Sequence, residues 1–258
     1  MSRHLLPHGL AEVREKVRDA GHLSIFLDFD GTLTPIVDDP ATAQLAPEMQ
    51  AVLEALARRD DTLLVFVSGR SVEDLRPRVP IPEVVYAGNH GLEIHGRVNF
   101  VEPSALAKAG LLKRLLANLS ESLRHTPRAW VEDKELTATV HYRRAGAHEE
   151  RAIANIVHAA LARHSALFQL NVGKKVFEIV PRTTWHKGAA VCWINARLAR
   201  PGGASIYIGD DRTDEDAFVH LPGEITIRVG KSEITAARYN VDDTDQVRLF
   251  LQWLNENR

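Results

Sequence analysis

The clearest indication of the fold is the segment Leu23-Ser24-Ile25-Phe26-Leu27-Asp28-Phe29-Asp30-Gly31-Thr32. Its first five residues are nearly all apolar and fit a short strand that is buried on both faces of a sheet. The strand runs directly into two aspartates at positions i and i+2, whose side chains leave the strand end in the same direction. One carboxylate can act as a nucleophile and the other as a general acid and base. The alternative is a polar strand end that caps the next helix.

Buried strands alternate with helices through the first part of the chain. The segments 62–67 and 84–87 are short and apolar, and Pro47 opens a helical pattern between the first two strands. The same pattern resumes late in the chain, with a helix at 187–198 and a strand at 205–208. Strands that alternate with helices favour a parallel, doubly wound sheet, in which ligands bind outside the carboxyl ends of the strands.

The pattern changes in the middle of the chain. Two helices there accompany strands in which apolar and polar residues alternate, as along 136–142. Such alternation predicts a sheet with only one face buried. We therefore expect a core formed by residues 1–102 and 182–258, with a smaller α+β module inserted at 103–181.

Composition excludes several classes of protein. The chain has 32 Lys and Arg against 34 Asp and Glu, a formal charge of −2, so neither nucleic acid nor an anionic membrane is an expected partner. Its one cysteine, Cys192, excludes an intramolecular disulfide and a cysteine-cluster metal site. No segment reaches the ~18 apolar residues of a membrane span, and the N-terminus lacks the apolar run of a signal peptide. We expect a cytoplasmic protein that is a monomer.

A second acidic cluster follows the predicted strand at 205–208. It contains Asp210, Asp211 and Asp214, followed by Glu215 and Asp216. Unit charges ~4 Å apart repel one another by roughly 4 kcal/mol near a protein surface, and a hard cation such as Mg²⁺ relieves that repulsion. The alternative is an acidic helix N-terminus, which accounts better for Glu215 and Asp216 than for Asp210.

Two further elements favour an anion at the strand ends. Ser68-Gly69-Arg70 places a hydroxyl and backbone amides after the strand at 62–67, although Ser-Gly is also ordinary turn chemistry. Lys187 begins a helix, where the helix dipole disfavours a cation. A lysine at that position indicates a nearby anion.

In this order and after these strands, the four elements resemble the haloacid dehalogenase (HAD) superfamily of phosphatases and phosphotransferases. The resemblance extends to the trehalose-6-phosphate phosphatase family over about residues 22–250, through the segments LDFDGTLTPIV, VFVSGRS, YAGNHGLEIHG, VEDKELTATVHYR, VGKKVFEIVPR, HKGAA and YIGDDRTDEDAF. One departure is His186 before Lys187, where an asparagine is commoner in relatives. The resemblance implies an α/β fold, with a HAD-like doubly wound parallel core and an inserted α+β cap domain.

The resemblance also implies a reaction, the hydrolysis of trehalose 6-phosphate to trehalose and phosphate. Asp28 would attack phosphorus and form an aspartyl-phosphate, while Asp30 would protonate the leaving oxygen and then deprotonate water. Ser68 and Lys187 would bind phosphoryl oxygens, and Lys187 would also orient Asp28. The residues implied to hold Mg²⁺ are Asp28, Asp30 through its carbonyl, Asp210, and Asp211 or Asp214 in support.

The inserted cap would close over a small-molecule sugar phosphate and exclude water. The substrate-binding residues implied by the family motifs are Gly69, Arg70, Asn89, His90, Glu132, Lys134, Lys174, Lys175 and Glu178. A solvated charged hairpin is the alternative for Glu132 and Lys134, and a structural histidine is the alternative for His90. His141 is expected to be structural or to position the cap. Trp130 and the other scattered tryptophans favour packing over a stacking platform.

Two other functions remain open at this point, and a third is discounted. One is a phosphatase for another sugar phosphate, such as sucrose 6-phosphate. Another is a phosphomutase, which shields the phosphoenzyme from water and returns the phosphate to a sugar. A catalytically silent regulatory domain is discounted, because it should have lost one of four residues that are all present: Asp28, Asp30, Lys187 and Asp210.

Overall fold

The computed structural model describes residues 3–4, 9–126, 128–173 and 175–257. The chain forms two compact units, each of which is described by itself. The core unit comprises Met1–Phe100 and Trp185–Arg258, and the inserted unit comprises Val101–Thr184. Among the described residues, no helix is both long and apolar enough to cross a membrane.

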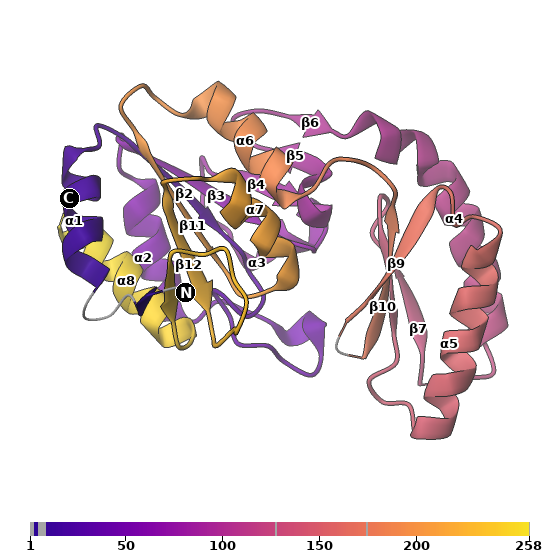
Figure 1. The fold of residues 1–258 in the computed structure, drawn as a ribbon. Coiled ribbons are helices and arrows are strands. Elements are labelled where there is room, and N and C mark those ends of the chain that lie inside the picture. Colours follow the sequence, from indigo (N-terminus) through magenta and orange to yellow (C-terminus); the bar gives the residue numbers. More distant parts are fainter. Residues whose placement is uncertain (1–2, 5–8, 127, 174, 258) are drawn as a thin grey trace. The chain divides into compact units, whose positions relative to one another are not determined.

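The core unit is built on a nine-stranded sheet in the order β1-β13-β12-β11-β2-β3-β4-β5-β6 (Figure 1). The strands from β1 to β4 in this order pair in parallel, whereas β5 runs antiparallel to β4. Four adjacent strands at its centre are buried along their whole length: β11 (Ala204–Gly209), β2 (Leu23–Leu27), β3 (Thr62–Val67) and β4 (Val85–Gly88). The remaining strands are β1 (Arg3–His4), β13 (Tyr239–Val241), β12 (Ile225–Val229), β5 (Glu93–His95) and β6 (Phe100–Val101). The predicted doubly wound parallel sheet is confirmed.

Helices cover both faces of this sheet. One face packs against α1 (Leu10–Asp19), α2 (Pro47–Ala57), α3 (Val72–Arg78) and α8 (Thr244–Glu256). The opposite face packs against α6 (Lys187–Leu198) and α7 (Glu215–His220). Short 3-10 turns follow three of the central strands: η2 (Pro40–Thr42), η3 (Asn89–Gly91) and η4 (Arg212–Asp214).

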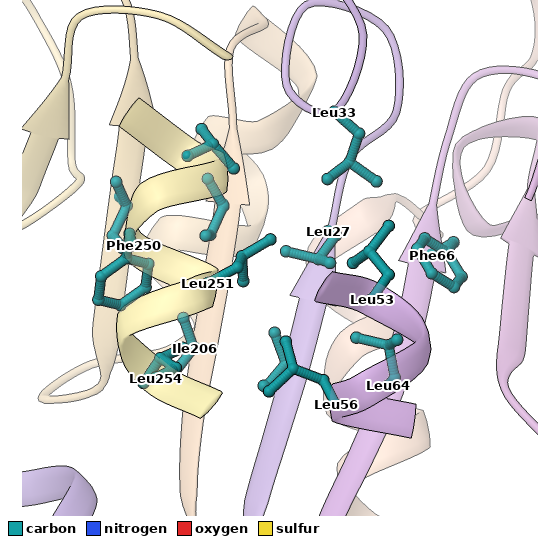
Figure 2. Close-up of a cluster of buried hydrophobic side chains, with 14 of the residues drawn as sticks. Leu27, Leu33, Leu53, Leu56, Leu64, Phe66, Ile206, Phe250, Leu251 and Leu254 are labelled. Atoms are coloured by element: carbon teal, nitrogen blue, oxygen red, sulfur yellow. The ribbon is translucent and has the colours of Figure 1, made fainter. Parts of the chain in front are cut away.

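The buried faces of α2 and α8 show why these segments are helical. Leu53 and Leu56 of α2 and Phe250 and Leu254 of α8 recur at intervals of three and four residues and lie over the apolar strands (Figure 2). Burying each such side chain stabilises the fold by roughly 1.5–3 kcal/mol. The apolar pattern of the sequence is thereby enough to place both helices on the sheet.

The inserted unit is a four-stranded antiparallel sheet in the order β7-β8-β10-β9. Its strands are β7 (Trp130–Asp133), β8 (Ala138–His141), β10 (Val176–Pro181) and β9 (Phe168–Val172). Two helices, α4 (Pro103–Leu123) and α5 (Ala147–Ala162), pack on one face of the sheet and share an apolar core with it. The other face is polar.

Strand β8 departs from the expectation of a sheet with one exposed face. Ala138 and Val140 face the helices as predicted, but Thr139 and His141 on the polar face are buried as well. The strand lies between β7 and β10, so side chains of neighbouring strands cover it, as Trp130 covers His141. Alternation therefore predicts the two faces correctly, and only within β8 does it predict the exposure of the polar side chains wrongly.

Candidate active site

Four adjacent strands of the core sheet end in the polar residues that the sequence analysis singled out. Asp28 follows β2, Ser68 follows β3, Asn89 follows β4, and Asp210 follows β11. These strands run in parallel, so all four residues lie at the carboxyl edge of the sheet. Residues from four separate parts of the sequence thus meet at one edge.

Lys187 connects the first and last of these segments. Its Nζ atom donates hydrogen bonds to Oδ1 of Asp28 and Oδ1 of Asp214, both at 2.8 Å. The three side chains are at most 6% exposed. Tyr207, on β11, donates its hydroxyl hydrogen to the same oxygen of Asp214 at 2.7 Å. The lysine is the first residue of α6, whose N-cap is His186, so the helix start carries the ammonium group to the two carboxylates.

The site holds more negative than positive charge. Burial raises the pKa of Asp28 well above its usual value, and the charges of Asp214 and Asp210 raise it further against the opposing effect of Lys187. Burial, and then the charge of Asp214, raises the pKa of Asp210 to about 7. Burial alone would lower the pKa of Lys187, but Asp214 and Asp28 outweigh it and raise that pKa well above its usual value. The lysine is therefore charged, and the carboxylates around it still repel one another.

This surplus of negative charge fits a divalent cation. Carboxylate oxygens of Asp28, Asp210 and Asp214 lie within 4.8 Å of one another. Oxygen ligands of this kind are what Mg²⁺ prefers. Gly31 allows the close approach, since a Cβ atom there would lie 2.1 Å from Oδ2 of Asp210, and its φ of 81° also favours glycine. The residues present therefore fit the magnesium ion that the sequence predicts.

The structure places Asp211 differently from these three aspartates. Its side chain accepts a hydrogen bond from the backbone N–H of Arg212 and caps η4. Its own N–H donates to Oδ2 of Asp214 at 2.9 Å. Asp211 thus caps this turn and orients Asp214 through its backbone, and its support of a metal ion stays a prediction.

The guanidinium of Arg70 makes several hydrogen bonds within the protein. Its guanidinium binds both carboxylate oxygens of Asp30 at 2.7 Å each, and it also binds Asp74 at 2.6 Å and the carbonyl oxygen of Pro40 at 2.9 Å. The side chain of Arg70 is 9% exposed, whereas that of Asp30 is 42% exposed. Bidentate geometry of this kind fixes a carboxylate in direction as well as in position. Arg70 therefore orients Asp30, and the substrate binding that the resemblance implies for it stays a prediction.

The turn after β4 docks on the Ser68-Gly69-Arg70 segment. Backbone N–H groups of Asn89 and His90 donate to the carbonyl oxygens of Arg70 and Ser68 at 2.7 and 2.9 Å. A Cβ atom on Gly69 would lie 2.7 Å from the His90 ring, so a glycine is needed there. The Asn89 amide donates to Glu93 at 2.8 Å. The Ser68 hydroxyl accepts from the N–H of Arg70 at 3.1 Å.

The remaining predicted substrate residues belong to the inserted unit. Glu132 on β7 and Glu178 on β10 both lie opposite Thr139 of β8, so they share the polar face of the sheet. Lys134 Nζ lies 3.9 Å from Oε2 of Glu132. The side chain of Lys175 forms an ion pair with Glu150 of α5, which packs on the opposite face, and Lys174 lies outside the described residues.

Some residues of the site were not anticipated from the sequence. Tyr207 and Asp74 make buried or half-buried hydrogen bonds to site residues, and the Thr32 hydroxyl donates to Asp210 at 3.4 Å. Tyr207 had one signal, a polar-tipped side chain within the strand that directly precedes Gly209-Asp210-Asp211. Asp74 had none, because an aspartate in the first turn of a helix is ordinary.

The fold is that of haloacid dehalogenase (HAD)-like proteins. The structure resembles a haloacid dehalogenase-like hydrolase from Bacteroides thetaiotaomicron with a TM-score of 0.63 and 15% identity, over 90% of this chain and 99% of that one. It also resembles the C-terminal domain of the C. albicans trehalose-6-phosphate phosphatase, with a TM-score of 0.79 and 23% identity over 99% and 98% of the two chains. At these identities the likeness establishes the fold.

Within that class the sequence identifies a family. A model of the trehalose-phosphatase family matches residues 26–245. Trehalose-phosphate phosphatase B of Arabidopsis thaliana is 35% identical over 252 residues, a match that covers 90% of this chain and 66% of the relative. The chain thus spans just under two thirds of that relative's length. It belongs to the trehalose-phosphatase family.

Proposed function

We propose that the protein hydrolyses trehalose 6-phosphate to trehalose and phosphate through an aspartyl-phosphate on Asp28, with Mg²⁺ as cofactor. The observation that carries the proposal is the cluster of Asp28, Lys187, Asp210 and Asp214 at the carboxyl edge of the core sheet. The family match supports the substrate. A regulatory domain without catalysis would not require a buried lysine held between two carboxylates, which costs desolvation energy.

The first half of the reaction transfers the phosphoryl group to the enzyme. Lys187 holds one oxygen of Asp28, and we assign the other oxygen, Oδ2, as the nucleophile. A bond forms between this oxygen and phosphorus while the bond from phosphorus to the sugar oxygen breaks. Asp30 donates a proton to the leaving sugar oxygen, and Arg70 keeps its carboxyl group in place.

The second half regenerates the enzyme. Asp30, now ionised, takes a proton from a water molecule whose oxygen attacks phosphorus. The bond between phosphorus and Asp28 breaks, which releases phosphate and restores the carboxylate. Ser68 and Lys187 would bind the phosphoryl oxygens in both halves, so positioning and charge supply most of the acceleration.

Mg²⁺ would be held by Asp28, Asp210 and the Asp30 carbonyl, with Asp211 or Asp214 in support. When bound, the cation screens the repulsion between the carboxylate nucleophile and the phosphate dianion. The pKa of Asp210, raised to about 7 by burial and by Asp214, supports a site that needs a positive charge.

The inserted unit would serve as the cap, in keeping with the insertion expected at 103–181. Glu132, Lys134 and Glu178 would bind the sugar hydroxyls, because paired carboxylates and amines discriminate among many hydroxyls. The common position of Glu132 and Glu178 on the polar face of the sheet supports this role for those two residues. A cytoplasmic location and a monomeric state stay predictions from the sequence.

Phosphate release from a panel of sugar phosphates tests the proposal. We expect the purified protein to prefer trehalose 6-phosphate over sucrose 6-phosphate and glucose 6-phosphate, and to lose this activity in excess EDTA. Turnover of another sugar phosphate would be consistent with the proposed phosphoryl transfer at Asp28 but would refute the assignment of the cap residues to trehalose 6-phosphate. Transfer of phosphate to an added sugar instead of water would indicate a phosphomutase, and no turnover at all would contradict an enzymatic function.

The Arg70→Lys variant tests the role of Arg70. Lysine keeps the charge but offers no planar fork for the Asp30 carboxylate, so we expect kcat to fall roughly 100-fold while the fold is retained. Phosphate release and a thermal melting curve measure the two effects. Arg76→Lys on the exposed side of α3 is the matched control and should leave kcat unchanged. A kcat within twofold of the wild type in Arg70→Lys would show that Asp30 does not depend on this contact.

A further inference from the structure

Glu132 lies where its side chain needs support from a neighbour. Its strand, β7, is at the edge of the inserted sheet and, among the residues that the structure describes, pairs with β8 alone. The Glu132 side chain is 36% exposed, and a long side chain on an exposed edge has many rotamers. A carboxylate that binds particular sugar hydroxyls does so well only if its side chain is held in a single rotamer.

His141 supplies that support from the neighbouring strand. Its Nε2 atom lies 2.7 Å from Oε2 of Glu132, and because a carboxylate accepts hydrogen bonds, the ring N–H donates. The His141 side chain is 9% exposed, far more buried than the glutamate that it contacts. Lys134 approaches the same oxygen at 3.9 Å. One oxygen of Glu132 is therefore anchored to β8 and to the turn after β7.

Trp130 in turn holds the His141 ring. The register of the hairpin places Trp130 directly opposite His141 on the same face of the sheet. The two rings are stacked, with centroids 4.6 Å apart and an angle of 10° between their planes. Direct cross-strand aromatic pairs of this kind stabilise a hairpin and restrict both side chains. Trp130 as a whole is nevertheless 43% exposed.

We propose that Trp130 and His141 are positioning residues that hold Glu132 in the geometry for binding the sugar, an inference that rests on the proposed sugar-phosphate substrate. Stacking by Trp130 fixes the plane of the imidazole, and the imidazole fixes Oε2 of the glutamate. The pair acts through Glu132 on recognition of the sugar and does not act on the transfer of phosphate. Neither residue was expected from the sequence to do more than pack or position the cap.

The test compares a sugar substrate with one that has no sugar. For the full chain, kcat and KM are measured with trehalose 6-phosphate and with p-nitrophenyl phosphate, and the ratio of the two kcat/KM values is the readout. We expect His141→Leu to lower this ratio about tenfold, because a misplaced binding group affects only the substrate that it binds. His141→Gln, which keeps an N–H donor at a similar reach, should restore most of the ratio.

Matched variants separate positioning from a structural effect. Trp130→Ala should lower the ratio and Trp130→Phe should preserve it, since phenylalanine keeps the stack. His148→Leu, at an exposed position on α5, is the control for the leucine substitution and should leave the ratio unchanged. Equal losses with both substrates in His141→Leu would indicate a structural role and overturn the proposal, as would a ratio that does not change.

A double variant shows whether His141 acts through Glu132. If it does, His141→Leu should cause no further loss in a Glu132→Gln background, and additive losses would contradict the proposal. Failure of the proposed function would look different, because the wild-type protein would then prefer another sugar phosphate in the panel. That substrate would replace trehalose 6-phosphate in the ratio, and turnover of no sugar phosphate at all would overturn both proposals.

Discussion

The Asp28→Asn variant is expected to lose turnover of trehalose 6-phosphate by at least roughly a thousandfold while it keeps its fold. An amide oxygen is too weak a nucleophile to form the phosphoenzyme, so the loss appears in kcat. The fold is retained because asparagine has the same shape and because Lys187 keeps its 2.8 Å contact with Asp214. The substitution also removes one of the carboxylates that repel one another at the site.

Phosphate release and thermal melting measure the two parts of this prediction. Asp60→Asn is the matched control. Asp60 is exposed and lies in the turn before β3, at the amino ends of the parallel strands and thus away from the site. This substitution should leave both turnover and melting temperature unchanged. Turnover above about a hundredth of the wild-type rate in Asp28→Asn would refute the nucleophile assignment. A large fall in melting temperature would mean that the loss of activity reflects unfolding.

The Lys187→Met variant is expected to be strongly destabilised as well as inactive. Methionine fills a similar volume without a charge, which leaves the buried carboxylates of Asp28 and Asp214 without their shared cation. Removing one partner of a buried ion pair typically costs about 3–5 kcal/mol, because the remaining charge stays desolvated. We expect a loss of this size in the free energy of unfolding, measured by urea denaturation in EDTA.

A control variant and a rescue by Mg²⁺ complete the test of Lys187. Lys16→Met removes a lysine that contacts Glu224 at 2.7 Å but is 33% exposed, and its cost should stay below about 1 kcal/mol. In Lys187→Met, added Mg²⁺ should recover part of the lost stability, since a cation bound by the carboxylates replaces the missing charge. A loss below about 1 kcal/mol in EDTA would show that Lys187 does not neutralise the buried carboxylates in the folded state.

Most of the fold was predictable because its main elements are strongly patterned. The strands at 23–27 and 62–67 are continuous apolar runs, and the helix at 187–198 begins at the residue expected from the sequence. The short strands β5 and β13 at the flanks of the sheet were not predicted. Each has three residues, and so short a segment has no periodicity that distinguishes it from a loop.

The sequence was enough to predict which segments form the site, but not which side chains contact one another within it. Asp28, Ser68 and Asp210 each follow a buried strand directly, so parallel pairing of those strands was enough to bring them to one edge. The partners of Arg70 and Asp211 were not predictable. The same residue types can bind a ligand, cap a helix or bind another side chain, and local sequence does not distinguish these uses.

The local sequence specifies which chemical groups stand at the strand ends, because the order of apolar runs and polar residues is a local property of the chain. Which of these groups come into contact depends on the folded arrangement of the strands. Lys187 joins Asp28 across 159 residues of sequence, and Arg70 joins Asp30 across 40. Such pairings depend on how the strands align and on which charges remain buried together once the sheet has formed. Long-range electrostatics and packing, rather than local pattern, therefore turn a set of candidate residues into a site.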